Sequence, residues 1–364
     1  MKILLAGGGS GGSVSPLLAV ANKIKTQHPK VHFLLVGTNS GPEKNMAEGQ
    51  NLEFAAITAV KLRRYFSWTN FLSPFLFLGA FYQSYKILKS YKPDCVFGAG
   101  SFVQVPIIWA AWFLKIPIII HQQDVVLSLA NKLCQLVASK ITVTFPESQA
   151  NFSSSLGIFY RKNPDKIMVT GNPFREQLTN GDKQKATSHF KLKTNFPTLL
   201  VLGGGTGAEF LNRLIIDCLP NLTKTVQIIH STGQGKGEKT SRENYHGVEF
   251  LNETDLADAY AAADMVLSRA GLSVITELAH LKKLSIIVPM PNSHQEINGL
   301  YLISKQAAIV IPQHKITANN FTGLIRKLVF AQEAKIELEE GIGKLMPKNA
   351  TQKIAETIIK LAEK

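Results

Sequence analysis

The stretch DMVLSRAGLSVITELAHLKKLSIIVPMPNSHQEIN, residues 264–298, decides the fold of the second half of the chain. A short apolar run leads into a glycine turn, a segment with helical spacing and a second apolar run. Apolar strands that alternate with helices predict a parallel α/β sheet. Such sheets bind ligands beyond the carboxyl ends of their strands, where helix N-termini offer unpaired N–H groups. We expect Arg269, Ala270 and Gly271 to lie at such an edge.

An acidic residue follows this turn on the predicted helix. Glu277 shares one helical face with Ser273. A carboxylate there can accept hydrogen bonds from both hydroxyls of a vicinal diol such as a ribose, while nearby amides receive phosphate oxygens. The alternative is a solvated helix face that needs no ligand.

The size and composition of the chain predict an ordinary two-domain α/β protein. It has 364 residues, 45% hydrophobic content and 27 glycines. Three scattered cysteines, Cys95, Cys134 and Cys218, are too few for a disulfide framework or a zinc site, which indicates a reducing compartment. The first apolar run meets glycines too early for a signal peptide, so we expect a cytoplasmic protein.

The formal net charge of +14 favours an anionic partner. No helix-turn-helix, zinc-finger or RNA-binding signature accompanies it, so we expect no nucleic-acid partner. An anionic membrane surface fits better, because each nearby basic side chain contributes about 1 kcal/mol there. A generally basic, soluble protein is the alternative.

A basic and aromatic segment between residues 61 and 90 supports the membrane interpretation. Aromatic side chains beside basic ones suit the lipid headgroup boundary, and the apolar run is too short and broken to span a bilayer. The alternative is a core helix covered by the rest of its domain. The residues of this segment, with three that extend it, are Lys61, Arg63, Arg64, Tyr65, Phe66, Trp68, Phe71, Leu72, Phe75, Leu76, Phe77, Lys86, Lys89, Trp109, Trp112 and Phe113.

Glycine-rich loops recur after apolar strands. Without side chains, backbone N–H groups can approach phosphates closely. The loops at 7–13 and 203–208 echo each other, which predicts two similar nucleotide-type halves. A third loop at 98–102 follows another strand. We expect the first helix to begin near Pro16, and we expect strands at 116–120 and 248–251.

These motifs jointly resemble those of the MurG family, the peptidoglycan N-acetylglucosaminyltransferases. The resemblance covers nearly the whole chain. It rests on the glycine loops, on Arg269-x-Gly271 with Glu277, and on His294-Gln295-x-x-Asn298. It also includes His121-Gln122-Gln123-Asp124 and the segment Gly-Asn-Pro-x-Arg at 171–175.

The resemblance implies the α/β fold called GT-B, two Rossmann-like domains with a cleft between them. Residues 1–165, joined by a returning helix at 341–364, would form the acceptor and membrane-side domain. Residues 166–340 would form the UDP-sugar domain. Asn349 is expected to cap the last helix, whose apolar face would include Ile354 and Ile358.

The reaction implied is inverting transfer of N-acetylglucosamine from UDP-N-acetylglucosamine to lipid I, the undecaprenyl-pyrophosphoryl-N-acetylmuramoyl-pentapeptide, giving lipid II in peptidoglycan synthesis. No cofactor or metal is implied, and the sequence has no Asp-x-Asp. The protein would be peripheral, at the cytoplasmic face of the cell membrane. The alternatives are a related GT-B transferase with another lipid acceptor, a UDP-sugar epimerase and an inactive UDP-sugar-binding protein.

The resemblance also assigns substrate-binding residues. The Arg175 guanidinium would reach the donor phosphates, Glu277 the ribose, and Gln295 the sugar, while Leu251 would contact the base. His230 lies at the end of another expected strand and is a candidate to line the cleft, but we expect it to be a structural histidine with satisfied hydrogen bonds. The substrate-binding set is Ser10, Gly11, Gly12, Asp124, Arg175, Gly205, Leu251, Leu272, Ser273, Val274, Ile275, Thr276, Glu277 and Gln295.

One departure from the family concerns catalysis. Ser13 occupies the place of the family's histidine, the leading candidate for helping to deprotonate the acceptor hydroxyl, and a serine has no useful basicity near neutral pH. Asp124 replaces the family's asparagine. Our hypothesis is that Asp124 supplies the missing base; the alternative is a polar cap at a strand end.

Overall fold

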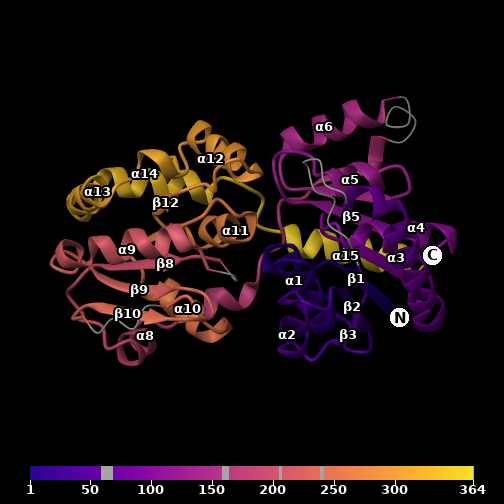
Figure 1. Cartoon of the computed structure of the whole chain (residues 1–364), viewed down its shortest axis with the longest axis horizontal. Coiled ribbons are helices and arrows are strands. Elements are labelled where there is room, and N and C mark those ends of the chain that lie inside the picture. Colours follow the sequence, from indigo (N-terminus) through magenta and orange to yellow (C-terminus); the bar gives the residue numbers. More distant parts are fainter. Residues whose placement is uncertain (59–68, 158–163, 205–206, 238–241, 364) are drawn as a thin grey trace. The chain divides into compact units, whose positions relative to one another are not determined.

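The computed structural model describes residues 1–58, 69–157, 164–204, 207–237 and 242–363, with the backbone alone at 69–75 and 164. The chain divides into two compact units, each built on one parallel sheet (Figure 1). Unit 1 comprises Met1–Phe174 and Pro347–Lys364, and unit 2 comprises Arg175–Met346. The expected boundaries, after 165 and 340, lie slightly earlier. Two parallel-sheet α/β units confirm the predicted fold class.

Unit 1 has seven strands in the order β3-β2-β1-β4-β5-β6-β7. The order reverses between β1 and β4, where Ile3 pairs with Cys95. Ligands of doubly wound sheets bind beyond the carboxyl ends at this reversal. The strands are β1 (Lys2–Ala6), β2 (His32–Gly37), β3 (Glu53–Ala56), β4 (Cys95–Gly98), β5 (Ile118–Gln122), β6 (Lys140–Val143) and β7 (Ile167–Val169).

Helices cover both faces of this sheet. Alternate residues of β1 enter opposite cores: Leu4 packs on one face and Ile3 and Leu5 on the other, so the strand is apolar throughout. The helices are α1 (Gly11–Gln27), α2 (Glu43–Glu48), α3 (Thr69–Tyr91), α4 (Gln104–Phe113), α5 (Leu129–Cys134), α6 (Pro146–Leu156), the 3₁₀ turn η1 (Pro164–Lys166) and α15 (Ala350–Ala362).

The last helix completes unit 1. α15 lies beside α1 in Figure 1, and its residues Ile354 and Ile358 are buried in the core that holds Ile3 and Leu5. This confirms the predicted apolar face. Asn349 occupies the N-cap position, but its side chain makes no capping hydrogen bond, so that part of the prediction was wrong.

Unit 2 has six strands in the order β10-β9-β8-β11-β12-β13, with the reversal between β8 and β11. The strands are β8 (Thr198–Leu202), β9 (Gln227–Ser231), β10 (Tyr245–Val248), β11 (Met265–Ser268), β12 (Ser285–Ile287) and β13 (Ile309–Val310). The helices are η2 (Glu176–Asn180), α8 (Lys183–His189), α9 (Glu209–Leu222), α10 (Glu253–Ala262), α11 (Leu272–Leu281), α12 (His294–Ser304), η3 (Gln313–Lys315), α13 (Ala318–Phe330) and α14 (Gln332–Gly343).

Three boundaries differ from the prediction. α1 begins at Gly11, so Pro16 lies inside the helix, beyond its first turn, where proline cannot donate the usual i→i−4 hydrogen bond. β5 continues through Gln122, because His121 and Gln122 are buried with hydrogen-bonded side chains. β10 ends at Val248, which leaves Leu251 in the turn before α10.

Candidate functional site

The helix α11 begins just beyond the carboxyl end of β11, at the strand reversal of unit 2. Gly271 holds its N-cap position and, having no side chain, cannot itself cap the helix. The N–H groups of a first helical turn have no intrahelical acceptor, and they carry the positive end of the helix dipole. The backbone of Leu272, Ser273 and Val274 therefore forms a surface suited to phosphate oxygens.

The turn before α11 is held by side chains from the neighbouring segment. Arg269 Nη1 donates to the carbonyl oxygens of Val288 at 3.1 Å and Pro289 at 3.3 Å. Asn298 Nδ2 donates to the carbonyl oxygen of Ala270 at 3.1 Å. Arg269 thus serves the backbone after β12, and the turn is fixed from two sides.

Glu277 lies one and a half helical turns into α11 and is only 5% exposed. Its Oε1 accepts a hydrogen bond from Arg175 Nη2 at 2.7 Å, and its Oε2 accepts one from the Tyr260 hydroxyl at 2.7 Å. A carboxylate can accept about four hydrogen bonds. The buried carboxylate is therefore paired and retains acceptor capacity on each oxygen.

Arg175 joins Glu277 to the start of α10. Its Nη1 lies 3.8 Å from Glu253 Oε1, while its Nε is buried without a hydrogen-bond partner among the described residues. Burial would lower the pKa of the Arg175 guanidinium, but Glu277 and then Glu253 outweigh burial and raise that pKa above its usual value. The charge of Arg175 is therefore permanent, and one donor remains available.

The other expected donor residues lie on separate elements of unit 2. Leu251 is buried just before α10. Gln295 Oε1 accepts a hydrogen bond from Met290 N at 3.1 Å, which braces the loop before α12. Thr276 Oγ1 donates to the Leu272 carbonyl oxygen at 2.6 Å, and Ile275 is in the core. Gly205 lies outside the described residues.

In unit 1, the structure brings the glycine loops at 7–13 and 98–102 together. The carbonyl oxygen of Gly8 accepts hydrogen bonds from Ser13 Oγ at 3.1 Å and from Ser101 Oγ at 2.8 Å. Ser13 Oγ also lies 3.0 Å from the Ser10 carbonyl oxygen. The Ser13 hydroxyl, which stands where the resemblance places a histidine side chain, therefore stabilises the loop that contains it. Ser10 sits at the N-cap of α1 without a side-chain cap bond, ahead of Gly11 and Gly12.

A buried carboxylate supports the first loop from beneath. Glu43 is fully buried, and its Oε1 accepts hydrogen bonds from the backbone N–H groups of Gly9 at 3.1 Å and Thr38 at 2.6 Å. A Cβ on Gly8 would collide with the same oxygen. Glycine is therefore required there by close packing, since Glu43 occupies the space of a side chain.

Asp124 follows β5 on a loop shaped by Gln122. Gln122 Nε2 donates to the carbonyl oxygens of Asp124 at 2.9 Å and Val126 at 2.7 Å. A glutamate at this position could not donate these two bonds. The Asp124 side chain is partly exposed. Gln123 Nε2 donates to the Ala99 carbonyl oxygen at 3.0 Å, which ties this loop to the second glycine loop.

Two histidines are structural. His121 has Thr142 Oγ1 2.9 Å from Nδ1 and Asn172 Oδ1 2.8 Å from Nε2, and burial lowers its pKa to about 4. His230 lies between the Tyr245 hydroxyl and Asn212 Oδ1, each at 3.0 Å, and burial lowers its pKa to about 4. The structural role predicted for His230 is confirmed.

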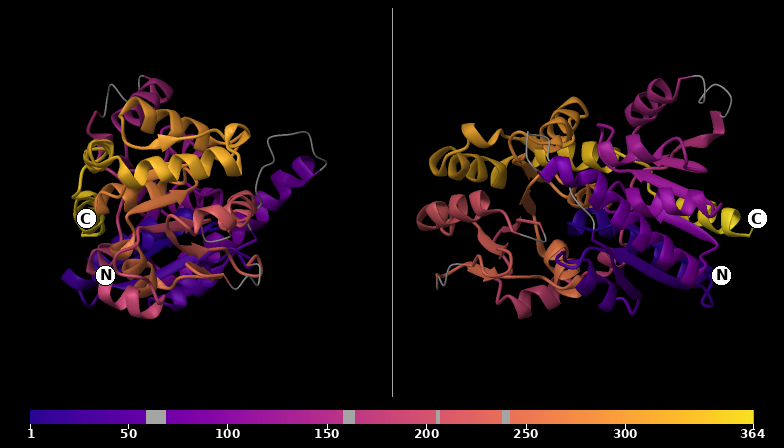
Figure 2. Two further views of the ribbon diagram at one scale, coloured as in Figure 1. Left: turned by 90° about the vertical axis from the view of Figure 1, so that its left-hand side faces the viewer. Right: turned by 45° about the vertical axis from the view of Figure 1, so that its right-hand side comes forward.

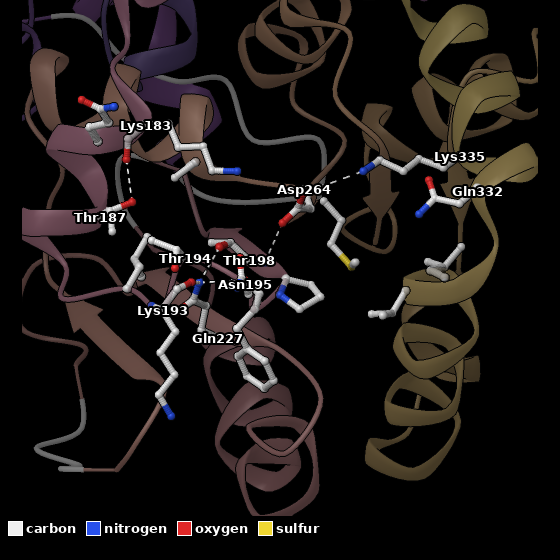
Figure 3. A pocket seen from close by; sticks show the side chains of 18 residues that line it. Lys183, Thr187, Lys193, Thr194, Asn195, Thr198, Gln227, Asp264, Gln332 and Lys335 are labelled. Carbon is white, nitrogen blue, oxygen red and sulfur yellow. Dashed lines mark hydrogen bonds and ion pairs between the residues drawn. The ribbon is translucent and has the colours of Figure 1, made fainter.

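A cavity of about 370 Å³ in unit 2 lies at the opposite edge of the sheet from α11's N-terminus. It is lined by Thr198 and Met265, the first residues of β8 and β11. Figure 3 shows Lys335 reaching towards Asp264, which it approaches to 3.9 Å. Asp264 also accepts a hydrogen bond from Thr198 N at 2.8 Å. Because these are amino-terminal strand ends, this cavity is separate from the candidate donor site.

Aromatic and aliphatic side chains on α3 and α4 form an exposed surface on unit 1. The amino-terminal part of α3 projects from the rest of the unit (Figure 2). Lys86 Nζ lies 4.5 Å from the centre of the Tyr82 ring. Trp109 is partly buried against the core. The exposed members among the described side chains are Leu76, Phe77, Leu78, Tyr82, Trp112 and Phe113.

The rest of the predicted membrane segment, including Lys61, Arg63, Trp68 and the side chains to Phe75, lies outside the described residues. Among the helices that are described, none has the length and hydropathy of a membrane span.

Two residues with roles at these sites were not predicted. Tyr260 contacts Glu277 across two helices, and no periodic pattern links residues 17 apart on different helices. Glu43 is an acidic residue at the start of a helix, and from the sequence such a residue is expected to be exposed. The glycines at 37 and 41, which both pack against Glu43, were a usable signal for its burial.

The sequence of the chain matches known protein families over most of its length. The chain matches the glycosyltransferase family 28 N-terminal domain over residues 3–143 and the family 28 C-terminal domain over residues 198–358. A relative from Clostridium kluyveri, named UDP-N-acetylglucosamine–N-acetylmuramyl-(pentapeptide) pyrophosphoryl-undecaprenol N-acetylglucosamine transferase, is 33% identical over 100% of this chain and 99% of its own length. A relative of the same name from Natranaerobius thermophilus is 32% identical over 99% of this chain and 100% of its own length.

Solved structures agree on the fold. The crystal structure of Acinetobacter baumannii MurG has a TM-score of 0.69 and 25% identity, and it covers 99% of each chain. A UDP-GlcNAc 2-epimerase from Neisseria meningitidis has a TM-score of 0.70 at 15% identity over 99% of this chain and 100% of its own, which is a likeness of fold alone. The chain therefore belongs to glycosyltransferase family 28 and, within that family, to the MurG transferases.

Proposed function

We propose that this chain transfers N-acetylglucosamine from UDP-N-acetylglucosamine to the muramoyl 4-hydroxyl of undecaprenyl-pyrophosphoryl-N-acetylmuramoyl-pentapeptide. Unit 2 would bind the donor, and unit 1 would bind the lipid-linked acceptor. The observation that carries the proposal is the α11 N-terminus, which begins at Gly271 beyond the carboxyl end of β11 with the paired Glu277 carboxylate behind it. Full-length relatives with this activity in their name support it.

In this proposal the donor diphosphate lies on the first turn of α11, and its ribose hydroxyls donate to Glu277. As the sugar bond breaks, negative charge grows on the departing UDP. Fixed N–H dipoles and a permanent guanidinium stabilise that charge without reorganising. Arg175 has a spare buried donor, Nε, which supports its proposed role near the phosphates. Gln295 would contact the sugar and Leu251 the uracil.

For the acceptor, we propose that the joined glycine loops after β1 and β4 bind its pyrophosphate, through the backbone of Ser10, Gly11 and Gly12. Asp124 would accept the proton of the attacking hydroxyl. The contacts of Ser13 support this assignment, because its hydroxyl is engaged with loop carbonyl groups. Asp124 is partly exposed, on a loop tied to the second glycine loop through Gln123.

The proposed location is the cytoplasmic face of the cell membrane, as a peripheral protein. The exposed surface of α3 and α4 and the net charge of +14 support it, because apolar side chains enter the headgroup boundary while basic groups attract anionic lipids. The test measures binding to vesicles with and without anionic lipid. It compares the wild type with the double variant Trp112→Ala, Phe113→Ala. Equal binding to both vesicle types would contradict it.

The activity is tested by incubating the purified chain with labelled UDP-N-acetylglucosamine and a short-chain lipid I analogue, with and without EDTA. We expect a disaccharide lipid in both conditions, because the sequence has no Asp-x-Asp with which to hold a metal on the diphosphate. Release of free sugar, or formation of an epimer, would contradict the proposal.

A further inference from the structure

The Glu277 carboxylate is held by donors from two different segments. Arg175 Nη2 binds Oε1 and the Tyr260 hydroxyl binds Oε2, each at 2.7 Å. Each carboxylate oxygen offers about two acceptor positions. One position on each oxygen is therefore filled by the protein, and one on each remains for a ligand.

The second donor comes from a completely buried ring. Tyr260 lies near the end of α10 and is 1% exposed. Burial, followed by the adjacent Glu277 carboxylate, raises the pKa of Tyr260 well above its usual value near 10. Its hydroxyl therefore keeps its proton and donates to Glu277 at every physiological pH.

Two donors restrict the carboxylate more than one donor does. The last torsion of a glutamate side chain has a broad, roughly two-fold preference, so a carboxylate held at one oxygen can still rotate. With a donor on each oxygen, the plane of the carboxylate is fixed. Its two remaining acceptor positions then keep one spacing and one direction, which matches a pair of neighbouring hydroxyls.

We propose that Tyr260 is a positioning residue that fixes the plane of Glu277 and so makes the site selective for nucleoside diphosphates with both ribose hydroxyls. The proposal rests on the donor site proposed above and deepens it. Tyr260 touches no substrate in this arrangement. It acts through Glu277, as a partner of a metal ligand or catalytic histidine acts through that residue.

The test compares UDP with 2′,3′-dideoxy-UDP, which lacks both hydroxyls, by calorimetry on the full-length chain. We expect the wild type to bind UDP more tightly. In Tyr260→Phe, we expect UDP affinity to fall about tenfold, because a charge-assisted hydrogen bond that orders the acceptor is lost. The affinity for the dideoxy nucleotide should stay within about twofold, since Glu277 makes no bond to it.

Tyr245→Phe is the matched control. Tyr245 is also a buried tyrosine of unit 2 whose hydroxyl bonds a side chain, His230, at 3.0 Å. Removing its oxygen creates a comparable defect away from Glu277. We expect the same preference for UDP over the dideoxy nucleotide as in the wild type, and thermal unfolding of both Phe variants checks that each is folded.

A second variant guards against an unfolded Tyr260→Phe. Glu277→Asp keeps Tyr260 but shortens the acidic side chain by one methylene, which moves the carboxylate away from the phenol. This variant should bind UDP more weakly than the wild type and the dideoxy nucleotide equally well. In a Glu277→Ala background, Tyr260→Phe should cause no further loss. A further loss there would overturn the proposal, because Tyr260 would then act by another route.

The role of Tyr260 and the donor site can be refuted separately. If the wild type prefers UDP and Tyr260→Phe keeps that full preference, the role of Tyr260 is refuted while the donor site stands. If the wild type binds the two nucleotides equally, Glu277 does not hold the ribose, and both the donor site and the role of Tyr260 are refuted.

Discussion

The candidate sites of the two units are held together by different kinds of chemical groups. In unit 2, charged side chains at the strand reversal are buried and paired: Glu277 with Arg175 and Tyr260. In unit 1, the loops at the corresponding place are joined by serine hydroxyls and one backbone carbonyl, that of Gly8, and the one buried carboxylate described there, Glu43, bonds backbone N–H groups instead of a charged partner. A site held by a buried charge network depends strongly on each member, because an unpaired buried charge is costly. A site made of backbone tolerates side-chain change more readily.

The largest effect should therefore come from unit 2. In Glu277→Ala, we expect UDP affinity to fall by about 4 kcal/mol, because the ribose acceptor is lost and Arg175 is left without its closest partner. Calorimetry measures this. Glu253→Ala is the control: Glu253 is 3.8 Å from Arg175 and more exposed, so the loss should be under about threefold. Unchanged UDP affinity in Glu277→Ala would break the comparison.

Acid should weaken both units by similar amounts. The pKa values of His121 and His230 are lowered from 6.5 to about 4, so both rings bind protons more tightly in the unfolded chain. The two histidines therefore cost no free energy of unfolding above pH 6.5. As the pH drops from 6.5 towards 4, each of them lowers the free energy of unfolding by up to about 3 kcal/mol.

Urea unfolding across this pH range measures the fall, with His28→Gln as a control because His28 is exposed. Replacing either buried histidine by glutamine should flatten the slope. A slope that neither substitution changes would assign the acid sensitivity to other groups.

In unit 1, the expected loss lies in turnover. Asp124→Asn restores the family's residue but removes the proposed base, and we expect the turnover number to fall on the order of 100-fold with donor affinity unchanged. Rates of disaccharide-lipid formation over a range of pH measure this. Unchanged turnover and an unchanged pH profile would leave Asp124 as a polar cap at the end of β5.

The smallest effect should come from Ser13→Ala. The hydroxyl contacts two loop carbonyl groups, and we expect its loss to reduce stability by about 1 kcal/mol and turnover by less than about threefold. Thermal unfolding and the same rate assay measure both quantities. A loss of turnover as large as that of Asp124→Asn would show that the serine takes part in the chemistry.

The sequence predicts the strands and loops well, because buried parallel strands are short apolar runs, and β1, β4 and β8 lead directly into glycine loops. It places Glu277 on a helix beyond β11, as observed. It does not predict the pairing of Glu277 with Tyr260, since that contact depends on how α10 and α11 pack. The end of β5 was also missed, because the polar residues His121 and Gln122 gain their buried partners only in the folded chain.

The return of the chain to unit 1 has a consequence for shortened chains. α15 supplies Ile354 and Ile358 to the core around β1, and Thr351 Oγ1 accepts a hydrogen bond from Phe174 N at 3.0 Å. Residues that follow unit 2 in the chain therefore complete the unit that precedes it. A chain that stops after Met346 would therefore contain all of unit 2 but a unit 1 without the helix that fills part of its core.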